Sequence, residues 1–105
     1  MTGLPFLFAA ALLLPSQAGA GDPQAGRAKA VACTVCHGPA GISTLPNAPN
    51  LAGQPAVYVE EQLRSFRNGK RGSEVMNVVA KPLSDADIAD LAAWFAAIKV
   101  EATPP

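Results

Sequence analysis

The sequence is poor in the residues from which most metal and redox sites are built. Its 105 residues contain two cysteines and one histidine, and the initiator is one of only two methionines. A structural zinc site normally uses four Cys or His ligands in a tetrahedron. This chain has only three such residues in total, so a zinc site would need a carboxylate as its fourth ligand.

The chain also lacks net charge and any internal repeat. Eight Lys and Arg residues balance eight Asp and Glu residues, so the basic surface typical of nucleic-acid binders is absent and we expect no nucleic-acid partner. The length allows one small domain. The basic residues between Arg64 and Arg71 are interpreted as a solvated helix face.

The N-terminal segment contains no charged residue before Asp22. Residues 4–14 form an uncharged, apolar run, and Ala18-Gly19-Ala20 follows it as a small-x-small signal-peptidase site. The run is shorter than the roughly 17 to 25 residues of a transmembrane helix. We predict a signal peptide at 1–20, cleaved after Ala20, an exported domain at 21–105 and no stable membrane insertion. An uncleaved N-terminal anchor is the alternative.

The remaining residues show helical patterns and no alternation typical of strands. Asp22-Pro23 starts a first helix that runs into the motif CTVCH at 33–37. A second helix spans 55–69 and ends at a glycine. A third begins at Ser84, with Asp87 three residues later as its capping-box partner. The sequence therefore predicts an all-α domain with three main helices joined by long loops.

Both cysteines and the only histidine lie within CTVCH. A thiol–disulfide centre would be expected in a βαβ context, for which the chain offers no strands. CxxCH is also the pattern of covalent haem attachment. Residues three apart share a helix face, so Cys33 and Cys36 can reach two vinyl groups on one porphyrin edge. His37 then lies over the macrocycle and can bind iron, and the motif favours one haem c.

These features, taken together, make the chain resemble the class I c-type cytochromes, in particular small bacterial periplasmic members and single repeats of dihaem relatives. The resemblance rests on CTVCHG at 33–38, PNLAGQ at 49–54, the stretch 58–71, Met76 and the helix at 83–96. It implies the class I cytochrome c fold, in which the first and last helices cross and loops wrap around one covalently bound haem. It also implies a periplasmic location.

The resemblance assigns roles to individual residues. Cys33 and Cys36 would form the thioethers and His37 would be an axial ligand of the iron. The backbone carbonyl of Pro49 would accept the hydrogen bond from the other ring nitrogen of that histidine, which orients the ring and raises its basicity. Gly26 would let the first helix approach Trp94 on the last.

A second axial ligand follows from the residues themselves. Met76 is the only methionine besides the initiator, and no second histidine exists. It lies in a short linking segment at 73–83 for which we expect one helical turn. Methionine in such a place is often core filler, but a thioether is a natural ligand of low-spin haem iron. We therefore predict His37 and Met76 as the metal ligands.

Two occupied axial positions favour electron transfer over catalysis. We predict a periplasmic one-electron carrier that is not an enzyme and that forms a monomer or weak, transient complexes with redox partner proteins. One alternative is an electron-accepting haem subunit held in a periplasmic dehydrogenase complex. Another is an enzyme or gas sensor in which Met76 does not bind the iron.

Overall fold

The computed structural model describes residues 2–12 and 21–105, and residues 2–12 form neither helix nor strand. The predicted cleavage after Ala20 lies outside the described residues. No helix in the described part of the chain combines the length and the apolar character needed to cross a bilayer.

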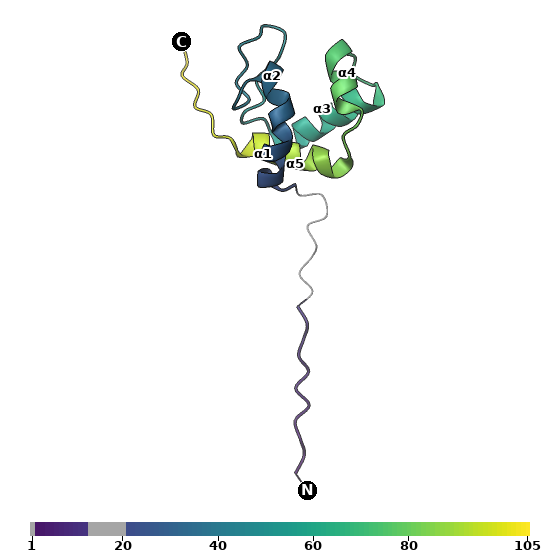
Figure 1. Cartoon of the computed structure of the whole chain (residues 1–105). Coiled ribbons are helices and arrows are strands. Elements are labelled where there is room, and N and C mark those ends of the chain that lie inside the picture. Colours follow the sequence, from purple (N-terminus) through teal and green to yellow (C-terminus); the bar gives the residue numbers. More distant parts are fainter. Residues whose placement is uncertain (1, 13–20) are drawn as a thin grey trace.

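The described domain is built from helices and loops, without a strand (Figure 1). The elements are α1 (Pro23–Lys29), the 3₁₀ turn η1 (Ala30–Cys33), α2 (Thr34–His37), α3 (Ala56–Asn68), α4 (Glu74–Ala80) and α5 (Asp85–Ala97). The prediction of an all-α fold is confirmed. The second and third main helices begin and end within a residue or two of the predicted positions, and the turn expected around Met76 is the seven-residue helix α4.

The sequence pattern predicts one continuous first helix, but in the structure this helix is interrupted. After α1 the chain tightens into the 3₁₀ turn η1, and α-helical geometry resumes in α2. The backbone N–H of Thr34 bonds to the Val31 carbonyl three residues back, and the Thr34 hydroxyl donates to the same oxygen at 2.7 Å. A threonine side chain that binds a carbonyl one turn earlier competes with regular α-helical bonding, which gives a local cause for the tightening.

The helix ends follow the predicted capping chemistry. The Asp22 side chain accepts a hydrogen bond from Gln24 N at 3.0 Å, with Pro23 in the first turn. Ser84 Oγ accepts from Asp87 N at 3.0 Å, and the Asp87 carboxylate accepts from Ser84 N at 2.9 Å. These two bonds form the predicted capping box.

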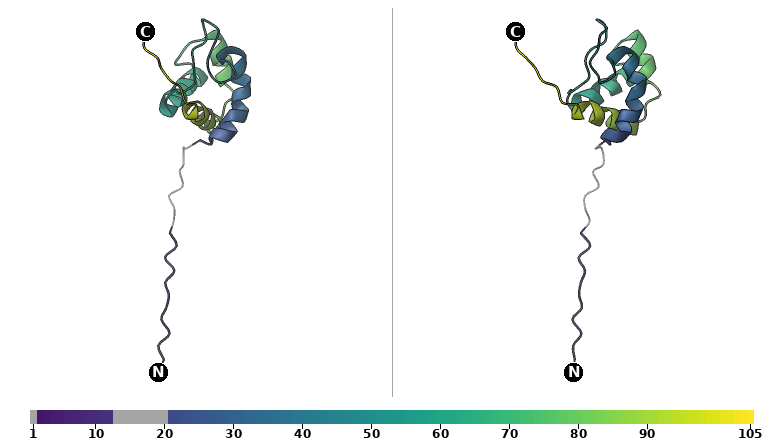
Figure 2. Two further views of the ribbon diagram at one scale, coloured as in Figure 1. Left: turned by 90° about the vertical axis from the view of Figure 1, so that its left-hand side faces the viewer. Right: turned by 60° about the vertical axis from the view of Figure 1, so that its left-hand side comes forward.

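Helices α1 and α5 cross in close contact, as two orientations of the ribbon show (Figure 2). A Cβ atom at Gly26 would collide with the Asp90 carbonyl oxygen and would lie 2.8 Å from Trp94 Cβ. Lys29 Nζ reaches from α1 to the carboxylates of Asp90, at 2.6 Å, and Asp87, at 2.9 Å. The expected approach of Gly26 to Trp94 is confirmed, and it fixes how the two helices pack.

The buried core is small and centres on α5. Ile88 is fully buried, and Leu91 and Phe95 pack with Ala30 from η1. Helix α3 packs against both α5 and α4. By contrast, several valines of the other helices are exposed, with Val35 at 83% and Val78 at 72%. The protein atoms alone therefore cover little of the apolar surface that α2 and α4 present.

Gly26→Ala should destabilise the protein because the new methyl group has no space at the crossing. Overpacking of this kind lowers the free energy of unfolding by about 1–3 kcal/mol. Urea unfolding of the purified protein, followed by far-ultraviolet circular dichroism, measures the change. Gly72→Ala is the matched control, because a Cβ there meets nothing within 4 Å. Equal stability losses in the two variants would contradict the close crossing.

The Asp87 carboxylate should make stability depend on acid pH. Its hydrogen bond from the Ser84 backbone, and then its bond to Lys29, lower the pKa of Asp87 from 3.8 to about 2. A pKa below the unfolded value stabilises the fold above pH 4, and this contribution disappears as the pH falls from about 4 to about 2. The difference in urea midpoint between wild type and Asp87→Asn should therefore shrink over that range.

Glu61→Gln serves as the control for this titration, since Glu61 is exposed. Its midpoint should follow that of the wild type at every pH. A constant difference between wild type and Asp87→Asn down to pH 2 would show that Asp87 does not stabilise the fold through its charge.

Candidate functional site

The two cysteines of the motif are half-buried at the junction of η1 and α2. Cys33 packs against the Ala30, Leu91 and Phe95 cluster, and neither cysteine forms a disulfide. Burial raises the pKa of the Cys33 thiol. A thiol–disulfide centre needs a thiolate of lowered pKa, so the surroundings of Cys33 do not favour that interpretation.

The His37 ring is held in one orientation by the loop that follows the motif. The residue is 8% exposed, and its Nδ1 lies 2.8 Å from the Pro49 carbonyl oxygen. A carbonyl oxygen can only accept, so Nδ1 carries a proton, and in the neutral ring Nε2 keeps a free lone pair. Nε2 has no hydrogen-bond partner among the described residues. Every fully buried side-chain nitrogen of those residues does have a partner, so Nε2 is not fully buried. The free lone pair therefore faces accessible space.

The expected hydrogen bond to Pro49 depends on a loop that is fixed at several points. Gly41, at φ 73°, is buried beside the Phe95 ring, and a Cβ there would lie 3.2 Å from the ring. The Gly41 carbonyl accepts from Leu51 N at 2.8 Å. A positive φ in a crowded position favours glycine strongly. Gly41 therefore anchors the loop and returns the chain so that Pro49 reaches His37.

Ser43 and Asn50 also fix this loop and were not anticipated from the sequence. Ser43 N donates to Asn50 Oδ1 at 2.7 Å, and Ser43 Oγ donates to the Cys36 carbonyl at 3.1 Å. Asn and Ser are common in such local side-chain-to-backbone bonds. Their presence in a loop rich in Pro and Gly was the available signal, but it did not indicate which backbone groups they would meet.

Met76 lies on a different element from the other predicted site residues. It is half-buried in the first turn of α4, and its N–H donates to Ser73 Oγ at 3.2 Å. The ribbons of α2 and α4 stand apart (Figure 1). The structure thus brings His37 and Pro49 together next to the two cysteines and places Met76 on the separate helix α4.

The described residues contain no group of three or more Cys, His, Asp or Glu side chains placed to share one metal ion. Cys33, Cys36 and His37 are neighbours along the chain, but their side chains do not converge on a single point. This geometry differs from that of a closed tetrahedral zinc site. It is the geometry expected when thiols and imidazole engage different atoms of a larger group.

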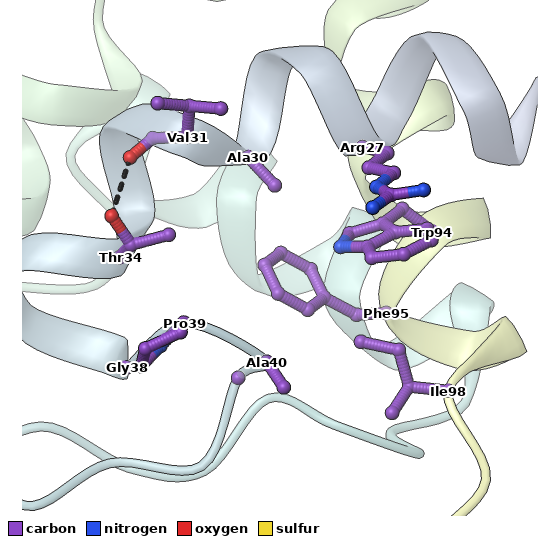
Figure 3. A pocket seen from close by; sticks show the side chains of 11 residues that line it. Arg27, Ala30, Val31, Thr34, Gly38, Pro39, Ala40, Trp94, Phe95 and Ile98 are labelled. Carbon is purple, nitrogen blue, oxygen red and sulfur yellow. Dashed lines mark hydrogen bonds between the residues drawn. The ribbon is translucent and has the colours of Figure 1, made fainter.

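A pocket of about 400 Å³ lies beside the motif (Figure 3). Its walls come from α1, η1, the start of α2, the loop at 38–41 and the end of α5, and the Arg27 guanidinium stands 5.6 Å from the centroid of the Trp94 ring. None of the predicted site residues lines it. The pocket therefore borders the motif at Thr34 but is not formed by the predicted haem-binding residues.

Comparisons with known proteins converge on one family. The family model described as Cytochrome c matches residues 23–99. Cytochrome c4 of Pseudomonas aeruginosa is 47% identical over 81 residues, which is 77% of this chain and 40% of that protein. Cytochrome c-554(548) of Halomonas halodenitrificans is 43% identical over 79 residues, which is 72% of this chain and 95% of that protein.

A further relative is named as a thiosulfate dehydrogenase electron acceptor, from Thiomonas intermedia. It is 41% identical over 78 residues, which is 72% of this chain and 36% of that protein. Among solved structures, reduced cytochrome c4 from Pseudomonas stutzeri superposes with a TM-score of 0.72 at 39% identity, covering 76% of this chain and 47% of that one. This chain spans about 40% of the length of the cytochrome c4 relatives.

Proposed function

This chain belongs to the cytochrome c family, and we propose that it is a periplasmic one-electron carrier with His37 and Met76 as the axial ligands of its haem c. The observation that carries the proposal is the state of His37. Its Nδ1 is occupied by the Pro49 carbonyl and its Nε2 is free, directly after two free thiols. The family holds haem c covalently, and these residues fit that group.

Each residue of the motif has a separate task in holding the haem. Cys33 and Cys36 would form the two thioether bonds to the haem, which require thiols that are not in a disulfide. The Pro49 carbonyl orients the His37 ring and makes its Nε2 a better donor to iron. Val79 of α4 is 40% exposed and lies three residues after Met76, so it shares the Met76 face and supplies apolar surface for the porphyrin to cover.

When bound, the haem supplies the exchange of one electron between Fe(II) and Fe(III). An imidazole from His37 and a thioether from Met76 would fill both axial positions, so no position is left for a substrate. That ligand set also raises the reduction potential relative to two nitrogen ligands. We therefore infer that the protein is not an enzyme and that it passes electrons between partner proteins.

The basic charges that could steer partners are only partly paired with carboxylates within the molecule. Arg67 contacts Asp85 at 2.7 Å and the Leu83 carbonyl at 3.0 Å. Arg71 donates to Gln62 Oε1 at 2.6 Å and lies over the Phe66 ring. Asp85 offsets the charge of Arg67, whereas the partners of Arg71 are neutral and leave its charge available for long-range steering. Transient docking through a small interface follows as the expected mode of contact.

Cleavage after Ala20 would keep in the mature domain two residues that contact α5. Gly21 lies so close to α5 that a Cβ would collide with the Ala89 carbonyl. Asp22 N donates to Asp90 Oδ1 at 2.8 Å. The fold therefore uses the chain from Gly21 onward, which supports a mature domain of residues 21–105.

A second candidate is an electron-accepting haem subunit of a dehydrogenase complex. The similarity to a protein named as a thiosulfate dehydrogenase electron acceptor favours this alternative. Purification from the periplasm at native abundance separates the two. A free carrier elutes alone on size exclusion, whereas a subunit elutes with a larger redox protein at fixed stoichiometry.

Met76→Ala should remove the methionine-to-iron charge-transfer band from the absorption spectrum of the oxidised protein. The wild type should show this band, since a thioether sulfur would be bound to low-spin iron. The reduced variant should also bind carbon monoxide rapidly at neutral pH, because one axial position opens. If the wild type shows the band and the variant keeps it, Met76 is only packing in the core.

Cys33→Ser should leave the haem attached through one thioether and lower the yield of holoprotein. Denaturing electrophoresis with haem staining, together with the pyridine haemochrome spectrum, counts the remaining thioethers. Thr34→Ser, which keeps both thiols and the hydroxyl that bonds to Val31, is the matched control. A variant that retained two thioethers, or lost none of its yield, would rule out the tethering role of Cys33.

A further inference from the structure

The side chain of Asn77 connects three stretches of chain next to Met76. Its Oδ1 accepts from Ser73 N at 2.7 Å, and its Nδ2 donates to the Phe66 carbonyl at 2.9 Å and to the Arg71 carbonyl at 2.8 Å. The amide thus joins the last turn of α3, the loop that follows it and the N-cap of α4. An asparagine amide offers two donors and one acceptor oxygen, and all are engaged here.

These bonds complete a helix cap that Met76 cannot complete. Ser73 is the N-cap of α4, and its Oγ accepts from Met76 N. In a capping box the third helical residue returns a hydrogen bond to the N-cap backbone. That position is Met76, whose thioether is only a weak acceptor. The next residue, Asn77, provides the returning bond instead, which leaves the Met76 side chain free for another role.

Helix α4 depends on such bonds at its N-terminal end. At seven residues it is too short to be stable alone. Its C-terminal end is anchored by Ala80, which is fully buried, whereas Val75 and Val78 are 58% and 72% exposed. Apolar packing is therefore sparse around the first turn, and the polar contacts to α3 set where that turn lies.

We propose that Asn77 is a positioning residue that holds the first turn of α4 against the end of α3 and so keeps the Met76 sulfur in place for the haem iron. The inference rests on the proposed function, because it requires Met76 to be an axial ligand. Replacing Asn77 with alanine would leave Ser73 N and the Phe66 and Arg71 carbonyls without this partner.

The test compares holoprotein carrying Asn77→Ala with the wild type and with Asn68→Ala. Asn68 is the matched control because its Oδ1 accepts from Lys70 N at 2.9 Å in the same loop. The first measurement is the rate of carbon monoxide binding to the reduced protein. We expect Asn77→Ala to bind about tenfold faster, since loss of such hydrogen bonds shifts the opening equilibrium by roughly that factor. Asn68→Ala should match the wild type.

The second measurement separates a positioning role from a general effect on stability. Urea is added to the oxidised proteins while the charge-transfer band and the helical circular dichroism are recorded together. In Asn77→Ala the band should disappear at lower urea than the helical signal. In Asn68→Ala the two should disappear together. Coincident loss in Asn77→Ala, with an unchanged rate of carbon monoxide binding, would show that Asn77 contributes only stability.

The outcomes also distinguish this inference from the proposed function. A wild type without the charge-transfer band overturns both. A wild type with the band and an Asn77→Ala variant identical to it overturns the role of Asn77 alone. If Asn77→Ala yields no folded holoprotein, Asn77→Asp replaces it, because a carboxylate keeps the acceptor for Ser73 N but loses the donors to the Phe66 and Arg71 carbonyls. It should speed carbon monoxide binding in the same direction, and an unchanged rate would overturn the proposal.

Discussion

The hydrogen bond between His37 Nδ1 and the Pro49 carbonyl is the interaction on which the site depends. It joins the motif to the loop at 38–53, and that loop is held to the last helix through Gly53 N, which donates to the Phe95 carbonyl at 2.8 Å. Helix α5 is in turn crossed by α1 at Gly26. The orientation of one imidazole is therefore set by a continuous series of contacts from the loop through α5 to α1.

The second half of the site is built separately. Helix α4, which carries Met76, packs on α3, and α3 packs on α5. A haem bound by both ligands would join α2 to α4. Small domains often depend on cofactors for part of their core. Here the cofactor would connect two elements, α2 and α4, that pack on different parts of the domain.

Much of the fold could be predicted from the sequence because local rules decide it. Asp22 and Ser84 cap their helices with side chains that lie next to the groups they satisfy, and Gly26 lies where its missing side chain admits Trp94. The break in the first helix was missed because helical periodicity does not distinguish an α-helix from one turn of 3₁₀. Thr34 was its local signal.

The candidate site was less accessible to sequence reasoning, because it depends on contacts between distant residues. The spacing of CTVCH is enough to predict haem attachment. The bonds of Ser43 and Asn50 within the loop, and of Asn77 around Met76, depend instead on where backbone groups lie after folding. Spacing alone does not indicate such partners. The family resemblance supplied the Pro49 carbonyl, and the structure contains that hydrogen bond.

The most direct test of this account is the intact mass of the denatured protein after export and purification. The account gives a mass equal to residues 21–105 plus one haem, because two thioether bonds survive denaturation. A colourless protein with the mass of the polypeptide alone would contradict it.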